Sequence, residues 1–171
     1  MEAKEVNIFV LSLDPWESAQ MHCDILVNKM AVETMQMITC ACIARGIPTA
    51  SLPLSAAGKP LRGGYKHHPC SLWVQECWEN LLWTYNLGMA LCNQFQLRFG
   101  KQHSCEPKIQ MLMDWAIQSG AFPKLGDMTP FVQAMDDQYK NDDPVVAYRD
   151  WFSSKTYHRW DKGVPAPDWY Q

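Results

Sequence analysis

The chain has 171 residues, with 15 Lys and Arg against 18 Asp and Glu, and 47% of its residues are hydrophobic. This length and apolar fraction predict one folded domain over residues 1–171 and exclude an intrinsically disordered chain. Nucleic-acid binders usually carry an excess of Lys and Arg for phosphate contacts, so the net charge of −3 disfavours tight binding to duplex DNA.

The cysteines and the N-terminus bear on the cellular compartment. The seven cysteines are an odd number and mostly fall inside expected helices, which indicates reduced core thiols rather than disulfides. The acidic start over residues 1–5 does not resemble a signal peptide, and no run reaches the ~18–20 apolar residues of a membrane span. We therefore expect a cytoplasmic protein that does not engage membranes.

The first expected elements are a short strand and a long helix. Residues 6–11 form an apolar, strand-like run. Asp14 and Pro15 then predict a helix start, with Asp at the N-cap and Pro at the first helical position. The helical pattern continues to residue 44 and ends before Gly46.

A polar stripe runs along this expected helix, which is otherwise apolar on nearly all sides. At about 100° per residue, the stripe collects His22, Lys29, Glu33, Gln36 and Thr39. A helix that is apolar all round is normally buried, and an unpaired buried charge costs several kcal/mol. The stripe is therefore expected to have a structural partner or a ligand.

Lys29 and Glu33 form an i, i+4 pair within the stripe, which makes them the candidate catalytic pair, with His22 on the same face. An amine beside a carboxylate in a low-dielectric site can act as a nucleophile while the carboxylate handles protons or a developing cation. The alternative is an internal ion pair with a capping imidazole. The sequence leaves both open.

A long loop over residues 47–67 ends in Gly-Gly-Tyr-Lys-His-His-Pro-Cys, which opens a second long helix over residues 69–99. Glycines permit close backbone approach, and a helix N-terminus attracts anions. Lys66, His67 and His68 add hydrogen-bond donors there. A phosphate-facing loop is favoured over a zinc site, because the histidines and the cysteine lack the usual ligand spacing. The alternative is an ordinary polar loop without a binding role. No sequence motif indicates a metal or a cofactor.

Two further groups of polar residues are candidates for ligand binding. Arg98, at the end of the second helix, is followed by Lys101 and His103, and these residues are expected to line a cleft opposite the polar stripe. Tyr148 and Arg149 lie in the basic region of the C-terminal part, which also contains Lys140, Lys155 and Lys162. In each group, ordinary helix packing or a solvated surface is the alternative.

The remaining elements complete a mainly α fold. A third helix is expected over residues 106–119 and a short one over 144–152, followed by an aromatic C-terminal strap that ends in Trp169 and Tyr170. We therefore predict a single-domain helical bundle with two long helices and a short N-terminal strand-like segment. Whether it forms a homo-oligomer is left open.

Several short motifs resemble a poorly characterised family of small proteins from tailed bacteriophages. They span most of the chain and comprise residues 7–11, 14–15, 20–24, 29–30, 68–73, 98–103, 133–135 and 147–149 and the tryptophan-rich tail. Residues 64–69 are also similar to a glycine-tyrosine-basic-X-histidine-proline stretch of the pyrimidine-dimer DNA glycosylases. Those enzymes are compact helical proteins that flip a nucleotide and cleave its glycosidic bond through an amine–carboxylate pair.

This resemblance implies a DNA glycosylase with AP lyase activity on damaged or modified pyrimidines, in the cytoplasm of an infected host. The related enzymes use the α-amino group exposed when Met1 is removed. Glu2 should block that removal here, so Lys29 is the expected amine and Glu33 its carboxylate partner.

The alternative is a counter-defence protein without enzymatic activity, which sequesters a nucleotide signal or binds a host protein. Its phosphate contacts would come from the same His22, Lys29, His68 and Arg98. The acidic balance of the chain is no obstacle to such a role. The sequence leaves open whether any catalysis occurs.

Overall fold

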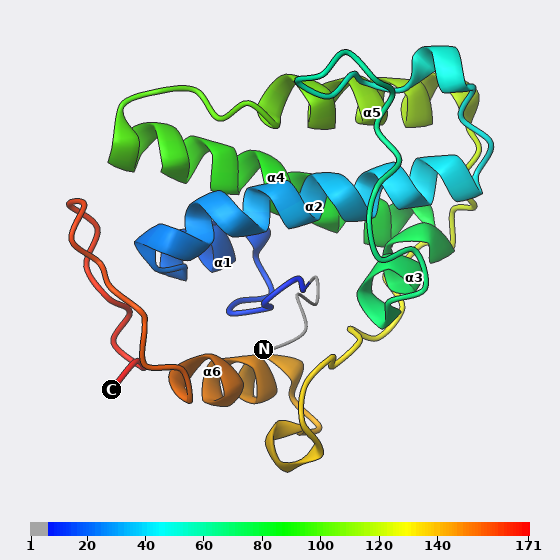
Figure 1. Cartoon of the computed structure of the whole chain (residues 1–171). Coiled ribbons are helices and arrows are strands. Elements are labelled where there is room, and N and C mark those ends of the chain that lie inside the picture. The colour runs from blue at the N-terminus through cyan, green and yellow to red at the C-terminus, as the bar shows by residue number, and fades with distance from the viewer. Residues whose placement is uncertain (1–6) are drawn as a thin grey trace.

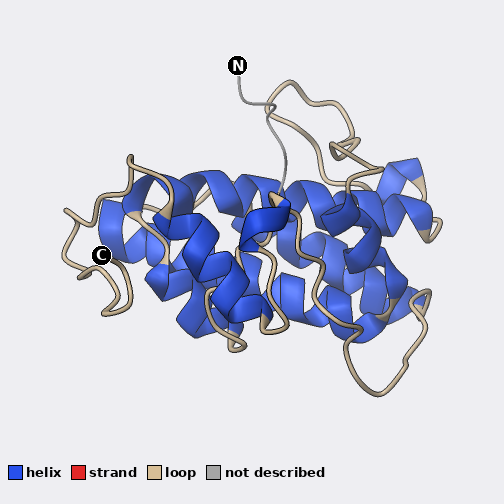
Figure 2. Cartoon of the chain, turned by 90° about the horizontal axis from the view of Figure 1, so that it is seen from below, coloured by secondary structure: helices blue, strands red, loops and turns tan. Residues whose placement is uncertain are grey.

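The computed structural model describes residues 7–171 as one mainly helical, compact domain. Over these residues it contains no β-strand, and its β pairing is confined to an isolated bridge between Leu54 and Pro60 (Figure 2). The predicted strand over residues 6–11 is therefore wrong for residues 7–11, while Val6 lies outside the described part. A strand needs a neighbouring ladder, and here the Asn7 N–H is bonded to the Glu33 carboxylate instead.

The predicted single helix over residues 15–44 is two helices, α1 (Pro15–Met21) and α2 (Asp24–Ala44). His22 and Cys23 between them have extended backbone, with ψ of 142° and 163°. The break is held by contacts from distant segments. The Asp24 N–H donates to the Arg159 carbonyl, and Arg98 donates to the carbonyl of His22.

The predicted helix over residues 69–99 is likewise divided, into α3 (Pro69–Glu76) and α4 (Trp78–Phe99). Cys77 is extended at φ −153° and ψ 168°. Because the Trp78 N–H donates to the Pro123 carbonyl, the first amide of α4 is satisfied by another segment rather than by the preceding turn.

The other helices have the ends that their capping residues favour. α5 spans Glu106–Ser119 and stops at Gly120, and α6 spans Pro144–Ser153 behind an Asp143 cap. The 3₁₀ turns η1 (Thr49–Ser51) and η2 (Asp137–Tyr139) interrupt the long connections.

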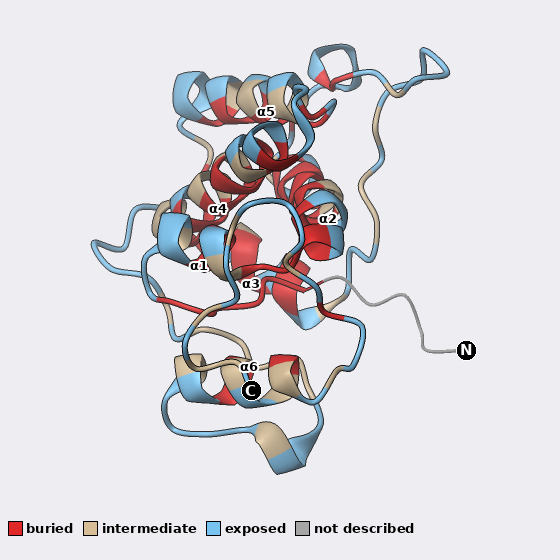
Figure 3. Ribbon diagram, turned by 90° about the vertical axis from the view of Figure 1, so that its left-hand side faces the viewer, coloured by how far each residue is buried: buried red, intermediate tan, exposed pale blue. Residues whose placement is uncertain are grey.

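The helices form layers around the pair α2 and α4 (Figures 1 and 3). α5 covers one side of this pair, and α1 and α3 flank it. At Gly88 of α4 the helices approach closely, since a Cβ there would stand 2.8 Å from Thr34 Cγ2 and 3.1 Å from Ile109 Cδ1. The glycine thus allows α2, α4 and α5 to share one core.

α6 lies on the opposite side from α5, and the N-terminal segment that begins at Asn7 runs between α6 and α2 (Figure 1). Aromatic rings join these layers. Phe9 stacks on Trp151 with ring centroids 5.1 Å apart, and it meets Phe152 edge to face. From the C-terminal tail, His158 stacks on Phe152 at 3.8 Å. Within residues 7–171, no helix is both long and apolar enough to cross a membrane.

Candidate functional site

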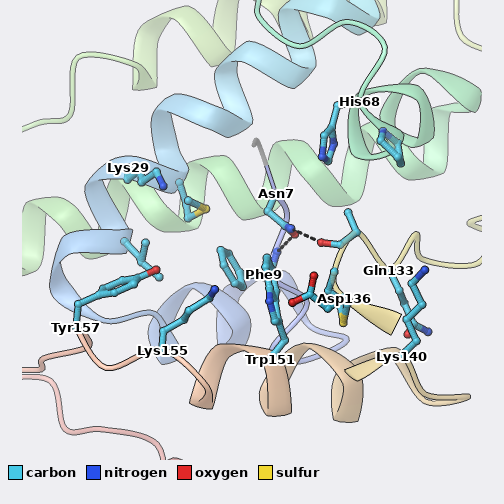
Figure 4. A pocket seen from close by; sticks show the side chains of 15 residues that line it. Asn7, Phe9, Lys29, His68, Gln133, Asp136, Lys140, Trp151, Lys155 and Tyr157 are labelled. Atoms are coloured by element: carbon cyan, nitrogen blue, oxygen red, sulfur yellow. Dashed lines mark hydrogen bonds between the residues drawn. The ribbon is translucent and has the colours of Figure 1, made fainter. Parts of the chain in front are cut away.

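A cleft of about 560 Å³ opens between α2 and α6, and the N-terminal segment forms part of its wall (Figure 4). Its lining combines cations, amides and aromatic rings from five parts of the chain. The residues that line it are Asn7, Phe9, Leu26, Lys29, Met30, His68, Pro69, Gln133, Ala134, Met135, Asp136, Lys140, Trp151, Lys155 and Tyr157.

Lys29 extends from α2 into this cleft. Its side chain is 51% exposed, and its Nζ lies 3.7 Å from Glu33 Oε1, which is too long for a tight ion pair. Glu33 is itself buried and does not line the cleft. Its Oε2 accepts the Asn7 N–H at 2.9 Å. The amine therefore faces the cleft, while the carboxylate behind it holds the N-terminal segment against α2.

Burial changes the acidity of this carboxyl group. Desolvation raises the pKa of Glu33 above its ordinary value, against the opposing effects of Lys29 and of the Asn7 N–H. A protonated Glu33 would lose the charge that attracts both partners. The carboxyl group is thus an acid whose protonation state is coupled to the wall of the cleft.

The wall has an unusual backbone conformation at Phe9, with φ of 35°. Such a conformation costs a non-glycine residue about 1–3 kcal/mol, so its surroundings must impose it. Two contacts do so here. Asn7 Oδ1 accepts the N–H groups of Ile8 and Phe9, and the Phe9 ring is stacked on Trp151. Phe9 is thereby presented to the cleft as a rigid ring.

The two ends of the cleft differ in chemistry (Figure 4). Lys29, Lys155 and Tyr157 lie at one end, and the Lys155 ammonium is 5.3 Å from the centre of the Trp151 ring. At the other end lie Gln133, Asp136 and Lys140, with the aromatic pair between the two ends. Lys140 is paired there with Asp137 at 2.7 Å. The cleft therefore has a basic end and a mixed polar end on either side of an apolar floor.

His68 is the second predicted site residue that lines the cleft. It is the N-cap of α3, and its Nδ1 accepts the Cys70 N–H at 3.1 Å. In the neutral imidazole this bond leaves the proton on Nε2. Its neighbours Lys66 and His67 are exposed and lie outside the cleft lining. Of the three candidate donors in the loop motif, His68 alone lines the cleft, together with the neighbouring Pro69, so the motif does not form a complete phosphate cradle.

His22, predicted in the catalytic set, is fully buried away from the cleft and ends α1. Its Nδ1 lies 2.6 Å from the Ser18 carbonyl oxygen. Burial lowers the pKa of His22 to about 4, with further lowering from Arg98 and His158. The ring is therefore neutral near pH 7, and its Nδ1–H donates to Ser18.

Arg98, predicted to bind phosphate, belongs to an internal network instead of the cleft. Its guanidinium donates to the carbonyls of Gln20 and His22, to Gln94 Oε1 and to Asp24 Oδ1. Asp24 in turn accepts the Asp161 N–H. Arg98 thus joins α1, α2, α4 and the C-terminal segment at the break between α1 and α2.

The remaining predicted ligand-binding residues also lie apart from the cleft lining. His103 Nε2 is 2.8 Å from Asn28 Oδ1, and the Tyr148 hydroxyl donates to the Val132 carbonyl. Arg149 donates to the Leu11 carbonyl and lies over the Trp169 ring. Lys101 is exposed, with its Nζ 6.0 Å from the centre of the Phe95 ring. The structure therefore does not bring these four residues together with Lys29.

Several residues of the cleft were not predicted as site residues. Tyr157 carries no sequence signal of its own, because only the folded chain places it beside α2. Asn7 and Gln133 lie in short motifs of the resemblance, but those motifs do not indicate that the two residues share a cleft. Lys140 and Lys155 lie in the basic region seen in the sequence, and this charge pattern was the available signal for them. Met1 and Glu2, which the resemblance made relevant to catalysis, lie outside the described residues.

Residues 7–171 contain no group of three or more His, Cys, Asp or Glu side chains that could hold a metal ion. A concave, mixed polar and aromatic cleft of this kind is typical of small-molecule binding sites. Comparisons of the chain with models of protein families, with curated proteins and with solved structures found no match.

Proposed function

We propose that this protein binds a nucleotide in the cleft between α2 and α6 and holds it without turnover. The observation that carries the proposal is the order of groups along the cleft. Two cationic side chains and a tyrosine stand at one end, and an aromatic pair forms the floor. The other end has the Gln133 amide, the Asp136 carboxylate and Lys140, whose charge is paired with Asp137.

The basic end supplies the contacts for phosphate. Lys29 and Lys155 come from different elements and approach the same end of the cleft. Their ammonium groups are donors that suit phosphate oxygens as point charges. Asp136 and Asp137 are the acidic residues near the other end, so the negative charge of a ligand is favoured at the Lys29 end. The cleft therefore orients an anion along its length.

The floor and the polar end suit the rest of a nucleotide. The half-buried Trp151 ring, with the buried Phe9 and Met30 beside it, gives the cleft an apolar floor for a base. Gln133 can donate and accept hydrogen bonds, and Asp136 accepts them from amino or hydroxyl groups. Sequestration needs these contacts but no catalytic group. The Glu33 carboxylate is consistent with this, because it is bonded to Asn7 and does not line the cleft.

The direct test is calorimetric titration of the purified chain with nucleoside mono-, di- and triphosphates. We expect one site per chain, affinity that falls as salt is added, and nucleotide that is recovered unchanged after long incubation. A lack of binding across the panel would exclude the proposal. Hydrolysis or transfer would show that the cleft is an active site instead.

A second function, the DNA glycosylase/lyase reaction, is favoured by the position of Lys29 in the cleft beside Glu33. In that reaction the deprotonated Lys29 Nζ attacks C1′ of the sugar, the glycosidic bond breaks, and the base leaves with a proton. The C1′–O4′ bond then opens as O4′ takes a proton from water, and the nitrogen lone pair forms the C=N bond of a protonated imine. A flipped nucleotide would occupy the same cleft.

Borohydride trapping separates the two functions. DNA with an abasic site or a cyclobutane dimer is mixed with the protein and reduced, with Lys29→Ala and Glu33→Gln proteins in parallel. A covalent adduct that disappears in Lys29→Ala would establish the lyase. Nucleotide binding without an adduct on either DNA is the result expected for sequestration.

A further inference from the structure

The segment between α2 and α3 encloses a second pocket, of about 880 Å³, separate from the cleft. Its lining joins an apolar floor to a basic rim. The residues concerned are Ile43, Ile47, Thr49, Leu52, Lys59, Pro60, Leu61, Arg62 and Lys66. In Figure 1 this segment leaves the end of α2, passes over α5 and crosses α2 on its way to α3.

The pocket is held in shape by the backbone of its own loop. The Leu61 N–H donates to the Pro53 carbonyl, and the Ser55 N–H donates to the Lys59 carbonyl at 2.7 Å. These bonds close a turn around Gly58 and fix the positions of the rim residues. The loop therefore has a defined conformation that its own backbone hydrogen bonds stabilise.

Gly63 fastens the loop to α2. It has φ of +70°, and a Cβ there would stand 2.5 Å from Cys40 Sγ and 3.1 Å from the Gln36 carbonyl oxygen. Next to it, the Cys40 thiol donates to the Gly64 carbonyl. Burial raises the pKa of Cys40, which keeps the thiol protonated as the donor. This contact sets the position of Lys66 at the rim.

The charged residues that line the pocket are all cationic. Lys59, Arg62 and Lys66 line it, and its lining as described contains no carboxylate. The sequence shows the same asymmetry on a larger scale, because no Asp or Glu occurs between Glu33 and Glu76 in a chain that has 18 of them. Arg45, the other cation of this stretch, is bonded to the carbonyls of Gln75 and Glu76. The rim thus attracts anions in a protein that is acidic overall.

We propose that this pocket binds a small amphipathic anion, a compound with an alkyl body and a phosphate or carboxylate head. The alkyl body would lie on Ile43, Ile47 and Leu52, and the head would meet Lys59, Arg62 and Lys66. The volume suits a ligand of this size, because sites for small molecules commonly measure ~300–1,000 Å³. Ile43 is 42% exposed, and a ligand would remove that apolar surface from water.

The experiment is calorimetric titration with decyl phosphate below its micelle concentration, beside hexyl phosphate, inorganic phosphate and decyltrimethylammonium. Decyl phosphate is expected to bind at one site. Each buried CH₂ contributes about 0.8 kcal/mol, roughly fourfold in affinity, so hexyl phosphate should bind at least tenfold more weakly. Equal binding of decyltrimethylammonium would overturn the role of the basic rim.

Two matched triple variants test the location. Lys59→Gln/Arg62→Gln/Lys66→Gln should weaken binding of decyl phosphate by about threefold to a hundredfold, since each exposed charge pair is worth ~0.2–1 kcal/mol. Lys101→Gln/Lys124→Gln/Lys162→Gln removes as many charges from positions over Phe95, Trp78 and Phe99, outside the pocket.

The control triple variant should bind as the parent does. An equal loss in both triple variants would show a non-specific effect of net charge and would overturn the proposal. Binding to phosphatidylglycerol vesicles without binding to monomeric decyl phosphate would also overturn it, because the occupant would then be a membrane surface. Circular dichroism confirms that each variant is folded.

Discussion

Arg98 and Lys29 are cations on neighbouring helices, yet they stand in opposite surroundings. Arg98 is buried, and its guanidinium is surrounded by two carbonyls, an amide oxygen and the Asp24 carboxylate. Lys29 is half exposed in the cleft, with one carboxylate oxygen at 3.7 Å. A buried cation whose N–H groups are all hydrogen-bonded within the protein stabilises the fold. An exposed cation in a concave site still has N–H groups that can donate to a ligand.

The two regions also differ in how they are assembled. The Arg98 network joins α1, α2 and α4, which pack directly on one another. The cleft forms where α6 faces α2 across the N-terminal segment, and aromatic stacking rather than helix packing connects these layers (Figure 1). We expect mutations in the first region to change stability and mutations in the second to change binding.

The largest effect is expected for Arg98→Met. This change leaves Asp24 as a buried carboxylate without its ion-pair partner, and loss of one partner of a buried pair costs about 3–5 kcal/mol. Urea unfolding measures the change. Lys101→Met, at an exposed position three residues further along, should stay within about 0.5 kcal/mol of the parent. Similar free energies of unfolding for the two variants would contradict the claim that the Arg98 network stabilises the fold.

The next effect is a pH dependence from the buried histidines. Burial lowers the pKa of His22 and of His158 from 6.5 to about 4, with Lys155 adding to the shift of His158. Both rings are neutral in the folded protein and gain protons more readily when it unfolds. Their stabilising contribution is therefore complete above pH 6.5 and is lost as the pH falls towards 4, by about 3 kcal/mol for each ring.

His158→Phe isolates one of these contributions. The ring can still stack on Phe152, and the change removes two buried ring nitrogens that find no hydrogen-bond partner within residues 7–171. Stability at pH 7 should be equal or higher, and the loss between pH 7 and 4 should shrink by about half. An unchanged pH profile of unfolding would show that His158 does not titrate in this way.

A smaller loss of stability is expected for Gly63→Ala, in the loop beside α2. The positive φ and the contact with Cys40 predict a cost of about 1–3 kcal/mol. Gly58→Ala is the matched control, because Gly58 has a similar φ of +71° but open space around its Cα. If the two variants unfold at the same denaturant concentration, the loop does not depend on its contact with α2.

The smallest effect on stability and the clearest effect on binding are expected for Lys29→Ala. The side chain is half exposed, so stability should change by less than about 1 kcal/mol. Nucleotide affinity should fall by about fivefold and lose part of its salt dependence. Lys101→Ala, which removes a charge outside the cleft, should leave the affinity unchanged.

The mainly helical fold could be predicted because many helix ends are encoded locally. Asp14 and Asp143 cap helices that begin with Pro, and Gly100 and Gly120 end helices in the left-handed conformation. The breaks at His22 and at Cys77 were missed, because the carbonyls that stabilise them come from Arg159 and Pro123, far along the chain. Local periodicity contains no information on such partners.

The candidate site could be predicted only in part, for a related reason. Lys29 and His68 are found in the cleft, whereas the sequence could not distinguish Arg98 from a ligand-binding cation. The difference lies in the carbonyls and the carboxylate that fold around Arg98. Asn7 and Tyr157 come from opposite ends of the chain, and only the tertiary structure reveals that both line one cleft.

The most direct test of the nucleotide site is its location by NMR. The ¹⁵N-labelled protein is titrated with adenosine monophosphate, and the backbone and Trp indole signals are followed. The account predicts that the shifts centre on Lys29, Lys155 and the Trp151 indole, and that Lys29→Ala reduces them at the same ligand concentration. Shifts confined to residues 59–66, or no shifts at all, would contradict a nucleotide site between α2 and α6.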